Sequence, residues 1–264
     1  MSKTALAVLA AALAAIALTG AVVRAQTGPA AGDSRAAPRE AEGEFQFVRL
    51  AYRSNRYGRG RGWGRRQIWQ TDWPDAEHHF SKGVSRLTRI DAADAGAIRT
   101  ALDDDIFDYP WIYAVEVGYW HLTHEEAARL RAYLLRGGFL MVDDFHGSFE
   151  WANFVASMER VFPDRPIVDI AETDSVLHVV YDLDHRIQIP SRMFIYSGVT
   201  WENNGVTPHW RGIYDDDGRL MVAINHNMDI GDAWEHADWP DYPENMTALA
   251  YRFGINYLVY AMTH

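Results

Sequence analysis

Short apolar runs alternate with helical patterns along the chain from residue 45 onward. The run FQFVRLAY at Phe45–Tyr52 predicts a first strand, and WIYAVEV at Trp111–Val117 predicts a second, buried one. Between these runs the sequence predicts helices over Asp75–Leu87 and Ala92–Leu102. Strands that alternate with helices are typical of an α/β domain built on a parallel sheet.

The best-defined unit begins at Thr123. Thr123 and Glu126 have the spacing of a capping box, and the residues that follow repeat apolar side chains on one helical face. Two glycines predict the end of this helix, and the apolar run Phe139–Asp144 follows at once. A strand, a capped helix and a second strand together predict a βαβ unit, whose strands are parallel.

The pattern changes after the next predicted helix, Phe149–Val161. The segment Ile213–Asn225 carries a turn signal between two strand-like runs, which predicts an antiparallel hairpin. A last helix is predicted over Met246–Met262. The order of elements predicts a doubly wound, mainly parallel sheet with antiparallel additions near the C-terminus.

The first 25 residues predict export. Lys3 precedes the apolar run Ala5–Val23, and Val23 and Ala25 occupy the −3 and −1 positions of a cleavage site before Gln26. The alternative is an N-terminal membrane anchor, since a spanning helix needs about 20 apolar residues. The alanine-rich run and its cleavage site favour a signal peptide. We therefore expect a periplasmic or secreted protein with no stable membrane span after cleavage.

Composition limits what the rest of the chain can do. Residues 26–43 are poor in apolar groups and predict a flexible linker, which leaves residues 44–264 as a single α/β domain. The net charge is −11, and signal cleavage would bring it near −13, which argues against a general nucleic-acid binder. The chain has no cysteine, so disulfides, thiol nucleophiles and thiolate metal ligands are excluded.

Acidic residues and a histidine mark the end of the predicted strand Phe139–Asp144. Asp143, Asp144 and His146 lie there, with Glu150 one helical turn further on. Open α/β sheets bind ligands at the carboxyl ends of their strands. These groups could hold a divalent cation through oxygen and nitrogen ligands, or act as a general acid and base. The alternative is structural, with Asp144 capping the following helix and His146 bonding buried backbone.

Other candidates follow neighbouring strands. His121 follows the predicted strand Trp111–Val117, beside Glu116 near the end of that strand. The arginine- and glycine-rich loop that follows the first strand carries Arg53 and Arg56 among six arginines, which suit a carboxylate or phosphate ligand. Pairing with acidic runs inside the chain is the alternative for this loop.

Two further groups are candidates for the same cleft. Trp63 and Trp69 are candidate stacking surfaces for a sugar ring, although aromatic side chains also fill cores. The acidic run that contains Asp229, Asp232 and Glu235 is a candidate lining, while Asp232 as a helix cap is its structural alternative.

Three segments carry a family resemblance: GGFLMVDDFHG at Gly137–Gly147, IYDDDGRLMVAINHNMDIGDAWE at Ile213–Glu235, and YRFGINYLVYAMTH at Tyr251–His264. With them the chain resembles a bacterial family, domain-of-unknown-function family 4159, over nearly all of Phe45–His264. That family is similar to the class I glutamine amidotransferase-like superfamily and to trehalose-utilisation-type domains, which implies a flavodoxin-like fold.

The resemblance does not bring a mechanism with it. Amidotransferases of that superfamily use a Cys–His–Glu triad, and a chain without cysteine cannot hydrolyse glutamine by that route. The trehalose-utilisation relatives share a glycine pair, a strand and a histidine, matched here by Gly137, Gly138 and His146. By analogy of fold, this favours a carbohydrate-related ligand.

We therefore expect a domain that binds a small polar or carbohydrate-like ligand at the edge formed by Asp143, Asp144 and His146. The arginine and tryptophan loops would close over that ligand. One alternative is a metal-dependent hydrolase of envelope glycans, in which a bound divalent cation activates water. Another is a non-catalytic envelope scaffold, which would need an exposed apolar patch.

Overall fold

The computed structural model describes residues 43–54 and 67–264. The predicted signal peptide and nearly all of the predicted linker lie outside the described residues, as do Arg56 and Trp63. Within the described part of the chain, no helix is both long enough and apolar enough to cross a membrane.

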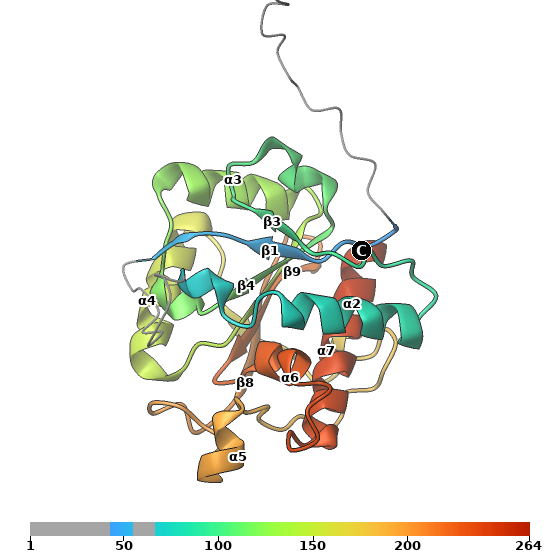
Figure 1. Ribbon diagram of the computed structural model, residues 1–264. Helices are drawn as coiled ribbons and strands as arrows, with labels where there is room; N and C mark the ends of the chain where they lie inside the picture. The colour runs from blue at the N-terminus through green and yellow to red at the C-terminus, as the bar shows by residue number, and fades with distance from the viewer. Residues whose placement is uncertain (1–42, 55–66) are drawn as a thin grey trace, which may run out of the picture. The chain divides into compact units, whose positions relative to one another are not determined.

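A seven-stranded sheet lies at the centre of residues 43–264 (Figure 1). Its strands are β1 (Val48–Leu50), β3 (Ala97–Arg99), β4 (Trp111–Val115), β6 (Phe139–Asp143), β7 (Val168–Asp169), β8 (His209–Tyr214) and β9 (Leu220–His226). Their spatial order is β3-β1-β4-β6-β9-β8-β7. The first five of these are parallel, and β8 is antiparallel to both of its neighbours. The predicted mainly parallel sheet with antiparallel additions is confirmed.

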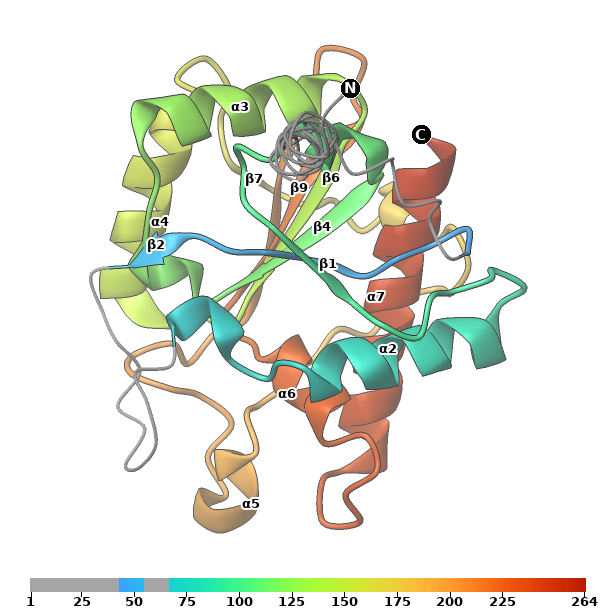
Figure 2. The same cartoon turned by 45° about the horizontal axis from the view of Figure 1, so that its top comes forward.

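Helices cover both faces of the sheet (Figure 2). One face packs against α2 (Asp75–Leu87), α6 (Ile230–Glu235) and α7 (Glu244–Thr263), and the other against α3 (His124–Leu135) and α4 (Gly147–Val161). The strands separate these two cores because successive side chains alternate between faces. On β4, Trp111 and Tyr113 enter the first core, whereas Ile112 and Ala114 enter the second.

Shorter elements complete the fold. A two-stranded antiparallel ladder joins β2 (Arg53–Ser54) to β5 (Trp120–His121). The long connection between β7 and β8 carries the short helix α5 (Met193–Ser197). Four 3₁₀ turns lie at η1 (Ile68–Gln70), η2 (Asp104–Asp108), η3 (Val117–Tyr119) and η4 (Ser175–Leu177).

The strongest local signals are confirmed. Helix α2 has the predicted bounds, and β8 and β9 form the predicted hairpin. The capping box is present: Thr123 Oγ1 accepts a hydrogen bond from the Glu126 amide at 3.2 Å, and Glu126 Oε2 accepts one from the Thr123 amide at 2.7 Å. After α3 the chain turns through Gly137, whose φ of +107° favours glycine.

The predicted helix over Ala92–Leu102 is wrong. The segment instead forms β3, which pairs in parallel with β1 at the register Val48↔Ala97. Alanine-rich segments gain only a few tenths of a kcal/mol per residue from helical propensity, which strand pairing at an open sheet edge outweighs. Gly96 also lets this segment pass close to α2, because a Cβ there would lie 2.8 Å from Glu77 Cγ.

Candidate functional site

Carboxylates gather where the parallel strands end. Because β4, β6 and β9 run in parallel, their carboxyl ends meet at one edge of the sheet. Glu116 follows β4 with φ 55°, and Asp144 follows β6 with φ 51°. Asp72, in the loop before α2, has φ 62°. Left-handed backbone is uncommon outside glycine, costs of order 1–3 kcal/mol, and clusters at functional sites.

These three residues line one cavity of about 380 Å³ at this edge. Seven carboxylate residues line it: Asp72, Glu116, Asp144, Glu202, Asp229, Asp232 and Glu235. Among the described residues, Arg192 is the only basic residue on the lining. We call this space the acidic cavity. Two unit charges about 4–5 Å apart repel by roughly 3–4 kcal/mol at an effective dielectric constant of 20. Seven carboxylates around one cavity therefore require protons or a cation to offset their charge.

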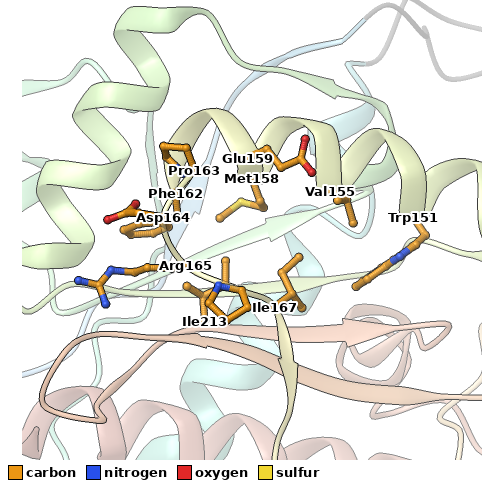
Figure 3. A pocket seen from close by; sticks show the side chains of 11 residues that line it. Trp151, Val155, Met158, Glu159, Phe162, Pro163, Asp164, Arg165, Ile167 and Ile213 are labelled. Atoms are coloured by element: carbon orange, nitrogen blue, oxygen red, sulfur yellow. The ribbon is translucent and has the colours of Figure 1, made fainter.

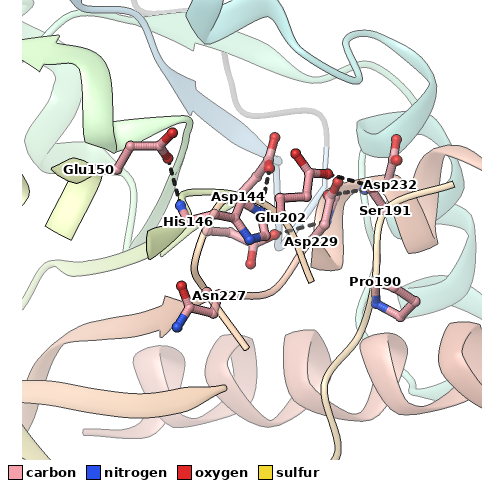
Figure 4. Close-up of polar contacts among 12 residues, drawn as sticks. Asp144, His146, Glu150, Pro190, Ser191, Glu202, Asn227, Asp229 and Asp232 are labelled. Atoms are coloured by element: carbon pink, nitrogen blue, oxygen red, sulfur yellow. Dashed lines mark hydrogen bonds and ion pairs between the residues drawn. The ribbon is translucent and has the colours of Figure 1, made fainter. Parts of the chain in front are cut away.

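Helix α6 positions two of the acids (Figure 4). Asp229 caps the helix, since its Oδ1 accepts a hydrogen bond from the Asp232 amide at 2.8 Å. Asp232 Oδ2 accepts one from the Arg192 amide at 2.7 Å, and its Oδ1 lies 3.5 Å from His236 Nε2. The start of α6 therefore fixes both carboxylates at the cavity wall.

A buried arginine positions Asp72. Arg49 Nη1 donates to the carbonyl oxygens of Trp69 at 3.1 Å and Thr71 at 2.7 Å, just before Asp72. Its Nε forms a buried ion pair with Glu77 of α2. Asp72 is itself only 5% exposed, and within the described part of the chain its Oδ2 has no hydrogen-bond partner.

Burial and mutual repulsion perturb these acids. Burial, and then the charge of Asp232, raises the pKa of Asp72 well above its ordinary value. Burial, and then Glu116, does the same to the pKa of Asp144. Asp232 differs: burial acts to raise its pKa, but hydrogen bonds from His236 and from the Arg192 amide bring the pKa below its ordinary value. The cavity thus combines carboxyl groups whose pKa is raised with one whose pKa is lowered.

Asp144 also contacts a buried histidine. His146 Nε2 lies 3.1 Å from Asp144 Oδ1, and His146 is 4% exposed. Burial lowers the pKa of His146, which favours the neutral form of its ring. Glu150 connects this segment to the turn after β4. Its Oε2 accepts a hydrogen bond from the His146 amide at 2.6 Å, and its Oε1 accepts one from the Tyr119 hydroxyl at 2.5 Å.

Asp143, the last residue of β6, bonds to α6 and is not among the residues that line the acidic cavity. Its Oδ2 accepts hydrogen bonds from the amides of Ile230 at 2.7 Å and Gly231 at 2.9 Å. Burial raises the pKa of Asp143 to about 7. The structure brings Asp144 and His146 into contact, but it does not gather Asp143 with them around one point.

Two other groups of three potential metal ligands come together among the described residues, each with atoms within 4.8 Å of one another. One consists of Asp72, Asp229 and Asp232, and the other of Asp232, Glu235 and His236. Neither contains a member of the predicted set of Asp143, Asp144 and His146.

The remaining sequence candidates are dispersed. Arg53 and His121 face each other across the β2–β5 ladder, and neither lines the acidic cavity. Trp69 is half-buried against the core beneath α3 and α4. Asp72 and Glu202 were not predicted as site residues, because each lies in a loop with no motif around it. Asp229, Asp232 and Glu235 were predicted from the density of acidic residues in their segment, and all three line the cavity.

A larger cavity of about 600 Å³ opens between α4 and the segment that leads into β7 (Figure 3). Its lining includes Trp151, Met158, Phe162 and Ile213 together with the charged residues Glu159, Asp164 and Arg165. It shares no lining residue with the acidic cavity, so the two cavities are separate.

Comparison with known proteins gives one result. Residues 46–262 match the model of a family described as a domain of unknown function (DUF4159). No curated protein matches the chain. The matched range contains all lining residues of the acidic cavity and well over half of the sequence. The chain therefore belongs to the DUF4159 family.

Proposed function

We propose that this domain binds a small polar ligand of carbohydrate-like character in the acidic cavity. The observation that carries the proposal is the ring of seven carboxylates around one cavity of about 380 Å³. An ionised carboxylate only accepts hydrogen bonds, so the ligand must supply donors. Hydroxyl and ammonium groups do so, whereas a carboxylate or phosphate ligand would meet repulsion.

Exposed aromatic rings near the cavity support a sugar-like ligand. Met193 and Glu202 both line the cavity, and the segment between them carries Tyr196 and Trp201. These two side chains are 69% and 42% exposed. Aromatic faces bind the apolar faces of sugar rings, while carboxylates bind sugar hydroxyls.

The strand order supports a flavodoxin-like arrangement for this cavity. Numbered along the chain, the five parallel strands have the spatial order 2-1-3-4-5, which is the flavodoxin-like order. In such sheets the ligand crevice lies outside the carboxyl ends of the strands, near the point where the order reverses. That point lies between β1 and β4, and Glu116 directly follows β4.

We also propose that the protein acts in the periplasm or outside the cell, on the strength of the N-terminal signal pattern. Cell fractionation and N-terminal sequencing test this. Mature protein that begins at Gln26 would support export, and an intact Met1 in the cytosolic fraction would contradict it.

The ligand proposal is tested with three probes of different charge: glucosamine, maltotriose and glucuronate. We expect glucosamine and maltotriose to bind in isothermal titration calorimetry and glucuronate to bind at least tenfold more weakly. Asp144→Asn should weaken the binding of both. Glu159→Gln, a carboxylate change in the larger cavity, should leave it unchanged. Equal binding of all three probes, or binding insensitive to Asp144→Asn, would reject the proposal.

A second candidate function is hydrolysis of a glycan, favoured by the contact between Asp144 and His146. A contact of 3.1 Å between an imidazole nitrogen and a carboxyl oxygen can hold that carboxyl group in one orientation for proton transfer. Release of reducing ends from an envelope glycan, lost in Asp144→Asn, would support it. Binding without any release would leave the domain as a ligand-binding module.

A further inference from the structure

Three buried carboxylates of the acidic cavity form a cluster in the described part of the chain. Each of Asp72, Asp229 and Asp232 offers an oxygen atom within 4.8 Å of the other two. Their exposed fractions are 5%, 3% and 7%. They come from two distant parts of the sequence, the loop before α2 and the start of α6, so the fold itself brings them together.

Hydrogen bonds within the protein satisfy these three carboxylates only in part. Asp229 and Asp232 each accept a backbone hydrogen bond, from the amides of Asp232 and Arg192. Asp72 Oδ2 has no partner among the described residues, although the side chain is more than nine-tenths buried on the cavity wall. An unsatisfied buried acceptor costs about 1–3 kcal/mol, and more when it is charged, so a ligand that contacts this atom would be stabilising.

We infer that Asp72, Asp229 and Asp232 bind one hard divalent cation of the size of Ca²⁺. Calcium is held by carboxylate oxygens at about 2.3–2.6 Å, so two ligand oxygens on opposite sides of the ion lie roughly 4.6–5.2 Å apart. Oxygens within 4.8 Å of one another can therefore reach a common Ca²⁺ ion without a change of backbone. Mg²⁺ demands near-ideal octahedral geometry and gives up its water reluctantly, so three carboxylates from two separate parts of the fold suit the more flexible coordination of Ca²⁺ better.

This cation site rests on the proposed function, because it lies in the same cavity. Ca²⁺ takes six to eight oxygen ligands, so three carboxylates leave coordination positions for others. Those positions would take water or neutral hydroxyl oxygens of a bound carbohydrate. The ion would thus offset the charge of the carboxylates and recognise the same class of ligand.

The second cluster is less suited to a metal ion. His236 Nε2 already lies 3.3 Å from Glu235 Oε2 and 3.5 Å from Asp232 Oδ1. The imidazole is therefore already engaged by both carboxylates of that cluster, which leaves Asp72, Asp229 and Asp232 as the better candidate set.

The test is calorimetric titration of CaCl₂ into the EDTA-treated protein, purified after expression of the full chain. We expect one Ca²⁺ per chain for the wild type, with MgCl₂ at least tenfold weaker. Asp72→Asn and Asp229→Asn should each weaken Ca²⁺ binding at least tenfold, and asparagine at 229 retains the helix cap. Glu159→Gln, in the larger cavity, should change the affinity less than threefold.

Thermal unfolding of the calcium-free proteins separates a lost ligand from a damaged fold. Asp72→Asn removes a like charge from a buried cluster, so its melting temperature without calcium should equal or exceed that of the wild type. No Ca²⁺ binding by the wild type, or unchanged binding by Asp72→Asn, would overturn the inference. If glucosamine and maltotriose bind and Ca²⁺ does not, the cation site fails alone. If Ca²⁺ binds and neither sugar does, the proposed ligand class fails instead.

Discussion

Asp143 Oδ2 accepts a hydrogen bond from the backbone nitrogen of Gly231 at 2.9 Å, which joins the end of β6 to the first turn of α6. The same oxygen accepts from the Ile230 amide at 2.7 Å. Asp143 thereby holds the helix that presents Asp229 and Asp232 to the cavity. Asp144, the next residue, lines the cavity itself. Two adjacent acids therefore have separate roles, one in support and one in the candidate site.

Asp143→Asn should change how stability depends on pH. Burial raises the pKa of Asp143 to about 7 in the folded protein, from an ordinary value of 3.8. Between these values the folded state holds a proton that the unfolded state has lost. Raising the pH through this window therefore lowers the free energy of unfolding, by up to about 1.4 kcal/mol per pH unit. Asparagine has no such proton, and its oxygen can still accept both amide bonds.

Urea unfolding at pH 5, 6, 7 and 8 checks this expectation. The variant should gain on the wild type steadily from pH 5 to pH 7 and then level off. Other titrating groups are common to both proteins and cancel in the difference. Parallel pH profiles for the two proteins would mean that Asp143 is ionised throughout this range.

Gly231→Ala should disturb the candidate cation site directly. A Cβ at this position would lie 2.4 Å from Asp72 Oδ2 and 2.6 Å from the Tyr113 hydroxyl, so Asp72 must move. We expect a lower melting temperature together with a loss of the Ca²⁺-induced rise in that temperature. Gly254→Ala in α7 is the matched control, since its Cβ would lie 2.4 Å from Phe80 Cε2 in the core. That variant should lose stability and keep the full calcium effect, and the same calcium response in both would contradict the role of Gly231.

Thr123→Ala should destabilise the domain by about 1 kcal/mol, the usual effect of removing a helix cap. The Thr123 hydroxyl accepts from the Glu126 amide, and alanine leaves that amide without this partner. Urea unfolding measures the change, and Thr123→Ser, which retains a hydroxyl, should recover most of it. An alanine variant as stable as the wild type would show that the first turn of α3 needs no side-chain cap.

The helix cap at Thr123 is an example of a feature that the sequence alone can predict. The capping box at Thr123, the helix Asp75–Leu87 and the hairpin of β8 and β9 depend on neighbouring residues, so their signals are local. The strand at Ala97–Arg99 depends on pairing with β1, about 50 residues away in the chain, and local propensity gave the wrong element there.

The candidate site, too, was predictable only in part from the sequence. The end of β6 was predictable as a ligand edge, because a strand followed by acids is visible in the sequence. The partners of Asp144 were predictable only in part: the acidic run with Asp229 was a candidate lining, whereas Asp72 and Glu202 reach the cavity only through the tertiary fold. Asp143 was predicted as part of the site because it lies beside Asp144 at the strand end, but its carboxylate accepts from the amides of α6 instead.

Arg49 was not recognised from the sequence, and replacing it should separate stability from cation binding. Arg49→Met leaves Glu77 buried without its ion pair, which typically destabilises a protein by about 3–5 kcal/mol. It also removes the donor to the carbonyl oxygens of Trp69 and Thr71, which hold the loop that bears Asp72. We expect the single variant to lose both stability and Ca²⁺ affinity.

The double variant Arg49→Met with Glu77→Leu tells these two effects apart. Removal of both charges leaves no uncompensated ion in the core, so urea unfolding should show much of the lost free energy restored. Calcium affinity should stay low, because the carbonyl oxygens beside Asp72 still lack their donor. If calorimetry instead finds wild-type affinity in the double variant, Arg49 serves the fold alone and Asp72 is held in place by its other neighbours.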